Sequence, residues 1–351
     1  MGSRRDIVFL DPINKGHSHV YFNASILSLF KAVPGKTILI GDRGHVRNVS
    51  TLAKAGNIAP FFINEKSALK RKVYALFSTL LKSAFRSKDI CFLSFDNTIV
   101  PLFLITFCPL LFRSRLTLII HNNLDTLLKH PLKRRLHRMA LSLYNGRSIV
   151  LTKKMYEIYS GLFPKIRCEF LPHPNYIGLI KYNRKSNLVN TQTINILLLG
   201  RQAKLLTSVL PKLNLGRYEN ITFITSLSSE NYPLHVSNVR FLPEKPDFDE
   251  YYTLLGEADF VLFANDDALE NRASGILIDC ISMNCPVIGP NKGHFVEFGP
   301  EFGFLYNSYS NLEGIFENIN DRKIKREMYI DKFSDAISRT DPQKWQRIFG
   351  I

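Results

Sequence analysis

Short apolar runs rich in β-branched residues alternate with helical patterns along the chain, and this order constrains the fold more than any other feature. Alternation of this kind predicts parallel sheets covered by helices on both faces. The expected strands of the first half are Ile7–Leu10, Thr37–Ile40, Ala59–Ile63, Ile90–Phe95, Leu116–Ile120, Ser148–Leu151 and Glu169–Leu171. Those of the second half are Ile194–Leu199, Ile221–Ile224, Val239–Leu242, Phe260–Phe263, Val287–Gly289 and Phe304–Leu305.

A polar stretch over residues 181–193 interrupts the alternation and is typical of a linker. The sequence therefore predicts an α/β protein with two Rossmann-like domains, residues 1–185 and 186–351, which face each other across a cleft. We also expect that the last helix packs back on the N-terminal domain. Ligands of open parallel sheets bind outside the carboxyl ends of the strands, so the loops there are the first places to look for a site.

Charge is distributed unevenly between the two halves. Residues 1–185 hold 30 Lys and Arg against 9 Asp and Glu, a net charge of +21, whereas residues 186–351 hold 16 against 21, a net charge of −5. Such asymmetry indicates that the first half faces a polyanion or an anionic membrane. The segments Lys66–Lys88 and His130–Arg138 are basic and amphipathic, which favours peripheral contact with an anionic leaflet. The alternative is that the apolar face of Lys66–Lys88 packs on the sheet.

The cysteines and the apolar runs indicate a cytoplasmic protein. Five scattered cysteines do not form a disulfide framework or a zinc pattern and fit a reducing compartment. The N-terminus has no signal core. The most apolar run, Ile99–Phe112, has 14 residues, fewer than the roughly 20 that span a bilayer, and is expected to be one buried helix.

Two places in the first half hold candidate site residues. The loop after the first strand contains Gly16, His17 and His19, and we expect it to contact an acceptor, because glycine allows close approach and a helix N-terminus favours anions or hydroxyls. His121 follows the strand Leu116–Ile120 directly, where a neutral imidazole can donate to a sugar oxygen. An ordinary capped turn is the alternative at both places. For His173, between two prolines, a structural turn is the better interpretation.

The second half holds two groups of candidate donor-binding residues. Arg201 and Lys204 come just after Gly200 at a strand-to-helix turn, which suits a diphosphate. Further along, Ser274 and Gly275 open a helix whose free amides suit a phosphate. Asp279 lies one helical turn further on, within reach of a ribose, and Glu270 and Arg272 precede the helix. Surface charge is the alternative for these residues.

The segment from Glu270 to Gly289 resembles the donor-binding signature of retaining GT-B glycosyltransferases, especially family 4. An acidic residue, a small-residue loop, a helix with a second acidic residue and a Pro-Val-Ile strand follow in the family order, and Asp279 precedes Pro286 by the family's seven positions. Gly293–Glu297 is similar to the family's Gly-Gly-x-x-Glu turn. Gly200-Arg201 with Lys204 resembles its diphosphate clamp, and His121 matches the histidine after an N-domain strand.

The resemblance implies a glycosyltransferase that retains anomeric configuration and needs neither a metal nor another cofactor. Arg201 and Lys204 would then neutralise the departing nucleoside diphosphate and Asp279 would hold the ribose. Glu270 and His121 would contact the donor sugar. The implied acceptor is a glycan or a lipid-linked glycan, as in bacterial surface polysaccharide biosynthesis (O-antigen or capsule), at the inner face of the plasma membrane. No nucleic acid partner is expected. A non-catalytic polyanion-binding protein and a nucleotide-sugar epimerase of the same fold are the alternatives.

Overall fold

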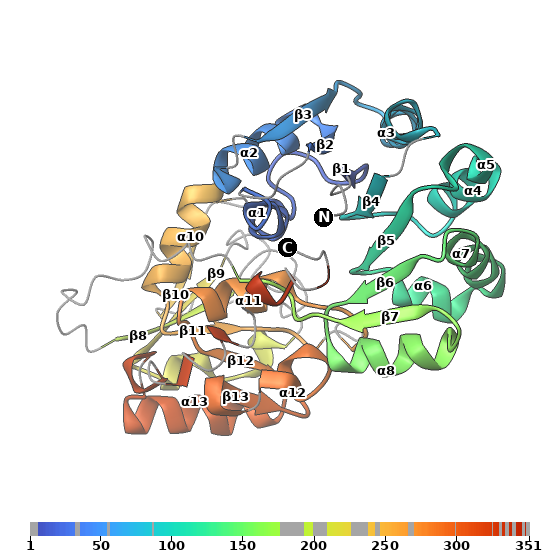
Figure 1. Cartoon of the computed structure of the whole chain (residues 1–351). Helices are drawn as coiled ribbons and strands as arrows, with labels where there is room; N and C mark the ends of the chain where they lie inside the picture. The colour runs from blue at the N-terminus through green and yellow to red at the C-terminus, as the bar shows by residue number, and fades with distance from the viewer. Residues whose placement is uncertain are drawn as a thin grey trace. The chain divides into compact units, whose positions relative to one another are not determined.

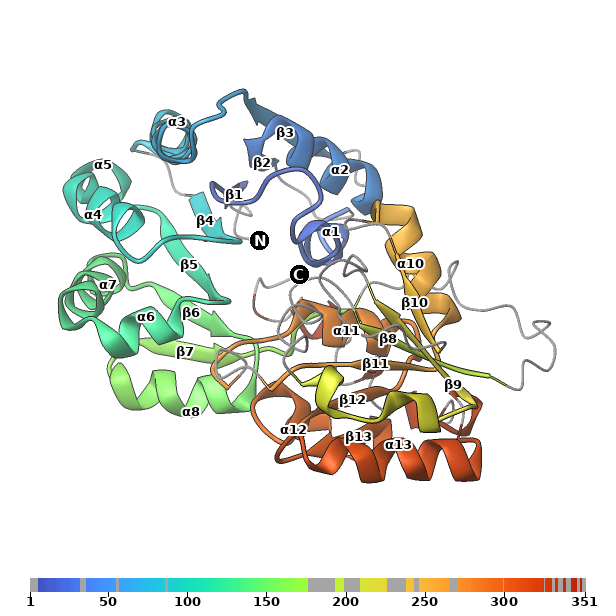
Figure 2. The ribbon, with the colours of Figure 1, turned by 180° about the vertical axis from the view of Figure 1, so that it is seen from behind.

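The computed structural model consists of two compact units, each built on a parallel sheet (Figures 1 and 2). The first unit comprises residues 1–174, 271–273 and 340–351, and the second comprises residues 175–270 and 274–339. The expected boundary at residues 185 and 186 lies outside the described residues. The structure describes residues 6–31, 36–54, 57–85, 88–175, 193–198, 209–225, 238–242, 246–265, 270–298, 300–324, 326–329, 332–333, 337–338, 342–345 and 348.

The first unit has a seven-stranded sheet in the order β3-β2-β1-β4-β5-β6-β7. Its strands are β1 (Asp6–Asp11), β2 (Thr37–Asp42), β3 (Ile58–Ile63), β4 (Lys88–Phe92), β5 (Arg115–Ile120), β6 (Arg147–Val150) and β7 (Arg167–Phe170). Its helices are α1 (Val20–Ser28), α2 (Arg43–Ala53), α3 (Ala68–Ser83), α4 (Ile99–Thr106), α5 (Cys108–Leu111), α6 (Leu124–Lys129), α7 (Pro131–Leu143) and α8 (Lys153–Leu162).

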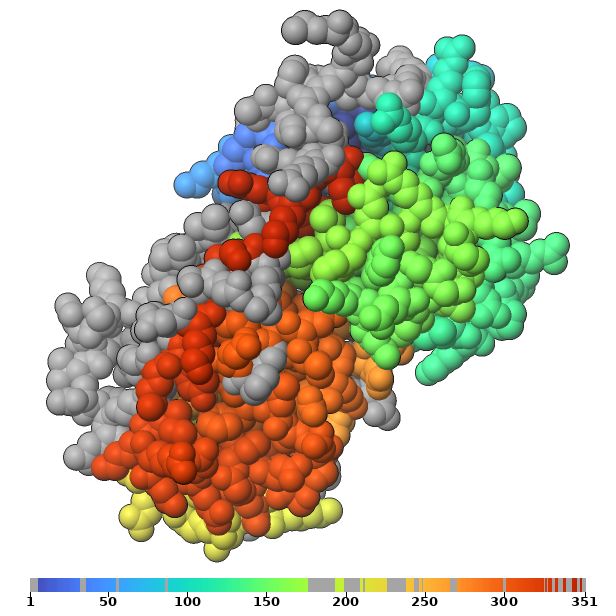
Figure 3. Space-filling model, turned by 60° about the horizontal axis from the view of Figure 1, so that its bottom comes forward, coloured from blue at the N-terminus to red at the C-terminus, as the bar shows by residue number. Residues whose placement is uncertain are grey.

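Both faces of this sheet are apolar, as expected for a parallel sheet between helices. Val8 and Leu10 lie in the core that α3, α4, α7 and α8 form on one face. Phe9 points to the other face, where its ring lies 4.9 Å from that of Phe30, just after α1. The C-terminal 3-10 helix η8 (Pro342–Trp345) contacts α1 on this face. Figure 3 shows part of the red C-terminal segment against the green part of the first unit.

The second unit has a six-stranded sheet in the order β10-β9-β8-β11-β12-β13. Its strands are β8 (Ile194–Leu198), β9 (Ile221–Thr225), β10 (Val239–Phe241), β11 (Phe260–Leu262), β12 (Val287–Pro290) and β13 (Gly303–Tyr306). Its helices are α10 (Phe248–Glu257), α11 (Gly275–Ser282), α12 (His294–Phe298) and α13 (Asn311–Arg322), with 3-10 helices η2 (Leu210–Lys212), η3 (Leu215–Arg217), η6 (Pro300–Phe302) and η7 (Arg326–Tyr329).

Aromatic side chains and one arginine hold the layers of the second unit together. Phe316 of α13 packs 5.1 Å from Phe223 of β9, and Phe295 of α12 packs 4.8 Å from Phe263, just after β11. The buried Arg326 guanidinium donates to main-chain carbonyls at the ends of α10 and α11, including those of Gly256 and Asn284, each at 2.8 Å. Cations at helix C-termini satisfy carbonyls that no intrahelical donor reaches.

Every strand expected from the sequence is present, but two helical segments differ from expectation. The run Ile99–Phe112 forms two short helices instead of one buried helix, and the chain breaks between them at Phe107, two residues before Pro109. Leu102 and Phe112 are exposed. In the structure α3 buries Leu76 and Leu80, as its apolar pattern predicts, yet it leaves Phe77 and Leu81 exposed.

Candidate functional site

The strand order creates a topological switch point beside β1 in the first unit. The chain winds outward from β1 through β2 to β3, and then returns to β4 on the other side of β1. At the carboxyl ends of β1 and β4, the chain therefore continues in opposite directions along the sheet. In open α/β sheets such a switch point forms the crevice in which ligands bind.

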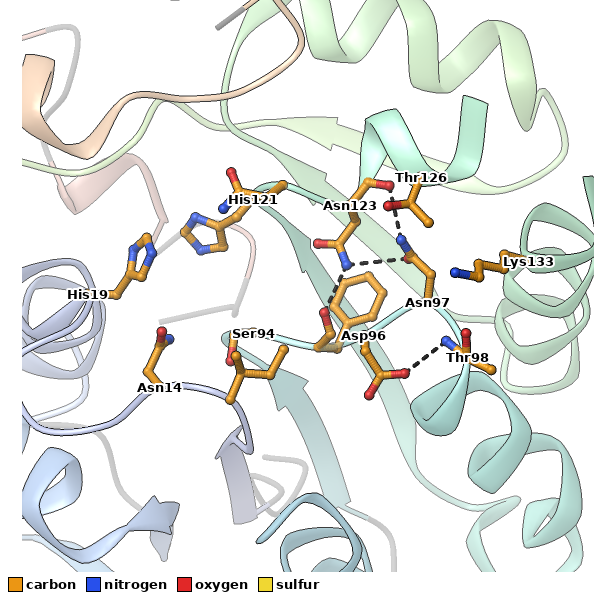
Figure 4. Close-up of a pocket in the computed structure, with 13 residues that line it drawn as sticks. Asn14, His19, Ser94, Asp96, Asn97, Thr98, His121, Asn123, Thr126 and Lys133 are labelled. Carbon is orange, nitrogen blue, oxygen red and sulfur yellow. Dashed lines mark hydrogen bonds between the residues drawn. The ribbon is translucent and has the colours of Figure 1, made fainter. Parts of the chain in front are cut away.

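A cavity of about 380 Å³ lies at this switch point (Figure 4). We call it the first-unit pocket. The loops after β1, β4 and β5 line it, together with one residue each from α6 and α7. The lining residues are Ile13, Asn14, His19, Ser94, Phe95, Asp96, Asn97, Thr98, His121, Asn122, Asn123, Thr126 and Lys133.

The fully buried carboxylate of Asp11 holds the loop after β1 in place. It accepts hydrogen bonds from the main-chain N–H of Asn14 at 3.0 Å, from the Asn14 amide at 2.8 Å and from the Asn23 amide at 2.6 Å. Ser94, in the loop after β4, also donates to it. Burial alone would raise the pKa of Asp11, but hydrogen bonds from His45, Asn14 and Ser94 outweigh it and lower the pKa. Asp11 therefore stays ionised and ties two pocket loops together.

His45 of α2 joins Asp11 to the glycine of this loop. Its Nε2 lies 3.2 Å from the Asp11 carboxylate, and its Nδ1 lies 3.3 Å from the carbonyl oxygen of Gly16. Gly16 has a φ of +51°, which favours glycine. Gly16 and the exposed His17 thus lie on the side of the loop that faces α2, and neither lines the pocket. Their role in acceptor binding stays a prediction.

His19 and His121, both expected from the sequence to be site residues, meet in the pocket. Their ring centroids are 5.2 Å apart, and Figure 4 shows the two rings next to each other. His19 has a φ of +53° at the start of α1, a left-handed conformation that His tolerates better than most residues. His121 is 8% exposed and packs 4.3 Å from Phe22. Burial, followed by the nearby His19, lowers the pKa of His121 to about 3, so its imidazole is neutral near pH 7.

Two buried asparagines connect the loops after β4 and β5. The amide of Asn97 donates to the carbonyl of Asn123 at 3.0 Å, and the amide of Asn123 donates to the carbonyl of Phe95 at 2.8 Å (Figure 4). Asp96 accepts from the main-chain N–H of Thr98 at 2.9 Å, just before α4. These bonds satisfy polar groups that would otherwise be buried without partners, so the pocket wall is held by side chains as well as by the sheet.

Arg272, predicted to bind the donor, has an acidic partner in the structure. Its Nε lies 2.9 Å from the carboxylate of Asp125, in the first turn of α6, and the amide of Asn271 donates to the same carboxylate at 3.1 Å. Residues 271–273 belong to the first unit by their contacts. Arg272 is therefore fixed at α6.

In the second unit, the start of α11 is organised by Ser274 and His294. Ser274 caps the helix by accepting from the main-chain N–H of Leu277 at 3.3 Å. The main-chain N–H of Ser274 donates to Nδ1 of His294 at 3.1 Å. Burial lowers the pKa of His294 to about 3, which keeps Nδ1 available as an acceptor. The ring thus fixes the direction in which the chain enters α11.

Asp279 lies on α11 against α10. Its carboxylate accepts from the hydroxyl of Tyr251 at 3.2 Å. Burial raises the pKa of Asp279 to about 7, although hydrogen bonds from Tyr251 and Tyr252 act in the opposite direction. Near neutral pH this carboxyl group is therefore only partly ionised. Glu270 is exposed.

The predicted diphosphate residues Gly200, Arg201 and Lys204 lie outside the described residues, so their placement stays a prediction. The strand order nevertheless gives the second sheet its own switch point between β8 and β11, which pair in parallel. The loop that carries Arg201 follows β8, and the segment leading to Ser274 and Gly275 follows β11. The two groups of residues thus follow neighbouring strands at the switch point of one sheet.

Sequence reasoning missed most of the pocket wall. Ser94 to Thr98 were overlooked because the strand Ile90–Phe95 was expected to continue past Phe92, where it ends. Lys133 lay in a basic segment interpreted as surface. Asp11 was detectable, because an acidic residue at the carboxyl end of an apolar strand is unusual.

Two kinds of feature are absent from the described part of the chain. No group of three or more His, Cys, Asp or Glu side chains there is arranged to hold a metal ion. Among the same residues, no helix combines the length and the apolar character needed to cross a bilayer. Catalysis without a metal stays a prediction.

Comparisons with known proteins give matches by structure alone. No protein-family model and no curated protein sequence matches the chain. Among solved structures, HepE of Anabaena with UDP and glucose is 14% identical, with a TM-score of 0.68 over 99% of this chain and 98% of that one. A glycosyltransferase of Rickettsia africae is 13% identical, with a TM-score of 0.65 over 99% and 98%.

A third structure, the lipopolysaccharide outer core galactosyltransferase WaaB, is 12% identical, with a TM-score of 0.63 over 98% of this chain and 99% of that one. Each of these three matches extends over nearly the whole of both chains, so the likeness includes both sheets and not one Rossmann-like half. The chain therefore has the GT-B fold.

Proposed function

We propose that this protein is a glycosyltransferase that moves a sugar from a nucleoside diphosphate sugar to a glycan or lipid-linked glycan. The observation that carries the proposal is the polar first-unit pocket at the β1 switch point of a chain that matches HepE, solved with UDP and glucose, over nearly its whole length. A role in bacterial surface polysaccharide biosynthesis (O-antigen or capsule) is supported by the likeness to a lipopolysaccharide galactosyltransferase.

In this proposal the second unit binds the donor. Arg201 and Lys204 neutralise the diphosphate, with the first amides of α11 at Gly275 as further donors, because helix N-termini stabilise phosphate. His294 supports this arrangement by holding the main-chain N–H of Ser274. Stabilising the departing nucleoside diphosphate by fixed positive groups needs no metal.

Asp279 binds the ribose in this proposal, and its raised pKa has a chemical consequence. A carboxyl group that is partly protonated near pH 7 both donates to and accepts from hydroxyl groups. Glu270, exposed just before α11, contacts the donor sugar. Retention of anomeric configuration follows from the resemblance to family 4.

His121 acts as a neutral hydrogen-bonding group on sugar hydroxyls. Burial keeps this imidazole neutral near pH 7, so one ring nitrogen carries a proton and the other does not. The ring therefore offers one donor and one acceptor to sugar hydroxyls. The ring of His19, whose centroid lies 5.2 Å from that of His121, provides a second imidazole.

The basic half contacts an anionic membrane surface in this proposal, at the inner face of the plasma membrane of a cytoplasmic enzyme. Support comes from exposed apolar side chains on one side of α3. Tyr74, Phe77 and Leu81 recur there at helical spacing, and Phe85, just after the helix, continues the line. We call these four residues the exposed stripe of α3. Lysines lie on the same helix. Apolar side chains flanked by basic ones are typical of surfaces that bind anionic leaflets.

The experiment that tests the function is a thermal-shift screen of the purified protein against UDP-, GDP-, dTDP- and CMP-sugars. One nucleotide sugar should stabilise the protein. Arg201→Ala should weaken that donor's affinity by about 10²-fold, because it removes one charged contact with the diphosphate. Arg240→Ala, an exposed arginine of β10, is the matched control and should bind the donor normally.

Three results would contradict the proposal. Full donor affinity in Arg201→Ala would exclude the diphosphate assignment. Epimerised donor without any acceptor would indicate an epimerase. Salt-dependent binding of nucleic acid with no response to any nucleotide sugar would indicate a polyanion-binding protein.

A further inference from the structure

The first-unit pocket contains one positive charge that the described part of the chain does not balance. Asp96 and Lys133 are the lining residues with a formal charge when the histidines are neutral. Asp96 is already engaged, because its carboxylate caps α4 through Thr98 and lies 3.4 Å from the ammonium group of Lys72. In the described part of the chain, Lys133 forms no ion pair and no side-chain hydrogen bond.

The position of Lys133 on its helix makes this charge unfavourable. α7 begins at Pro131, so Lys133 lies in the first turn, where the helix dipole favours anions. No acidic residue lies in that turn to compensate. Lys133 is half-buried, and Figure 4 shows its side chain extending toward Asn97. A bound anion would relieve both the dipole repulsion and the unpaired ammonium group.

The remainder of the pocket suits hydroxyl groups rather than a second charge. Four lining side chains that are at least nine-tenths buried are neutral and polar: Asn14, Asn97, His121 and Asn123. The volume of about 380 Å³ is at the small end of the range for ligand pockets. A small polyhydroxylated molecule with one anionic group matches both the size and the chemistry.

We propose that the first-unit pocket binds an acceptor sugar that carries an anionic group, a phosphate ester or a carboxylate, and that Lys133 selects for that charge. Calling this ligand an acceptor rests on the proposed function, whereas the binding of an anionic sugar does not. The sugar hydroxyls contact the buried neutral polar side chains of the lining, and the anion contacts the ammonium group at the start of α7. Lys133 is a specificity residue in this assignment, not a catalytic one.

The test compares three probes by titration in saturation-transfer NMR: glucose 1-phosphate, glucuronic acid and methyl glucoside. We expect at least one charged probe to bind about tenfold or more tightly than the neutral one, because a charge-assisted hydrogen bond is stronger than a neutral one. Added salt should weaken the charged probe only. Preference for glucose 1-phosphate would assign a phosphate ester, and preference for glucuronic acid would assign a carboxylate.

Variants then assign the preference to Lys133. Lys133→Met should bring the charged probe to the affinity of methyl glucoside, and Lys133→Arg should keep most of the preference. Lys129→Met, which removes an exposed charge at the end of α6 outside the pocket lining, should leave the preference unchanged. Equal binding of all probes, no binding of either charged probe, or an undiminished preference in Lys133→Met would overturn the proposal. Nucleotide-sugar binding is measured separately, so failure of the proposed function would be distinguishable.

Discussion

The two units share a parallel strand order with an equivalent switch point, but they hold their candidate site residues differently. In the first unit, side chains brace the loops: Asp11 receives donors from two loops, and Asn97 and Asn123 connect two others. In the second unit the described candidate residues lie on or next to one helix, α11, supported by His294 and Tyr251. The first arrangement favours a pocket of fixed shape, whereas the second favours backbone amides directed at an anion.

The largest difference between the units is expected when the fully buried Asp11 is compared with the half-buried Asp279. Asp11→Asn should destabilise the first unit by about 3–5 kcal/mol, because it breaks a buried, multiply bonded pair with His45. Asp279→Asn should cost the second unit about 1 kcal/mol or less, because its carboxyl group is partly neutral and an amide oxygen still accepts from Tyr251. Urea unfolding checks both, with fluorescence of the single tryptophan, Trp345, reporting on the first unit. Equal losses would contradict the comparison.

The second-largest expected difference between the two units is in how their stability responds to acid. Burial lowers the pKa of His121 and His137 in the first unit to about 3, whereas an unfolded histidine titrates near 6.5. The unfolded first unit therefore binds more protons below pH 6.5, and its stability should fall as the pH is lowered, by roughly 2–3 kcal/mol per pH unit for two histidines. Asp11 strengthens the loss only below pH 4, because an unfolded aspartate titrates near 3.8.

The second unit should respond less to the same change. His294, with a pKa lowered to about 3, also loses stability below pH 6.5. Asp279 acts oppositely: its folded pKa of about 7 exceeds the unfolded 3.8, so protonation favours the folded state between these values. Hydrogen-exchange mass spectrometry from pH 7 to 5 measures both units in one sample. A steeper acid response in the second unit would exclude this explanation.

The two units are also expected to differ in how much their exposed apolar side chains contribute to membrane binding. The double variant Leu81→Ser, Phe85→Ser removes two exposed apolar side chains from the stripe on α3 and should weaken sedimentation with phosphatidylglycerol vesicles about tenfold. Met328→Ser, at an exposed apolar position in the second unit, is the matched control and should have no effect. Equal losses in both variants would indicate nonspecific association.

The smallest expected effect concerns two helix caps. Ser274→Ala and Ser67→Ala each remove a hydroxyl that accepts a main-chain N–H at the third helical position, of α11 and α3 respectively, at a cost of about 1 kcal/mol. Only Ser274→Ala should also reduce the thermal shift caused by the nucleotide sugar, because only α11 contacts the donor in our proposal. A reduced shift in Ser67→Ala would contradict that assignment.

The strands were predictable because burial on both faces of a parallel sheet produces apolar runs that the sequence shows directly. His121 was predictable for a related reason, since a polar residue that ends such a run must lie at the edge of the sheet. Lys133 was not, because a half-buried lysine and a solvated one look alike within a basic segment. The ion pair of Arg272 with Asp125 joins residues far apart in the chain, and no local pattern encodes it.

The exposed stripe of α3 shows a further limit of periodicity. Leu76 and Phe77 both fit an apolar helical pattern, but one is buried and the other exposed. A helix with apolar residues around most of its surface does not reveal which side meets the sheet. Basic neighbours suggested a membrane role from the sequence, and the structure adds which side chains are available for it.

The C-terminal segment of the first unit affects how this protein is made. The indole N–H of Trp345 donates to the carbonyl of Pro172, and its ring lies 6.0 Å from Phe22 beside His121. These partners leave the ribosome long before Trp345 does, with the second unit synthesised in between. During translation, the face of the first sheet that α1 covers must therefore wait for the last stretch of the chain, and a ribosome that stalls early would release a first unit with that face incomplete.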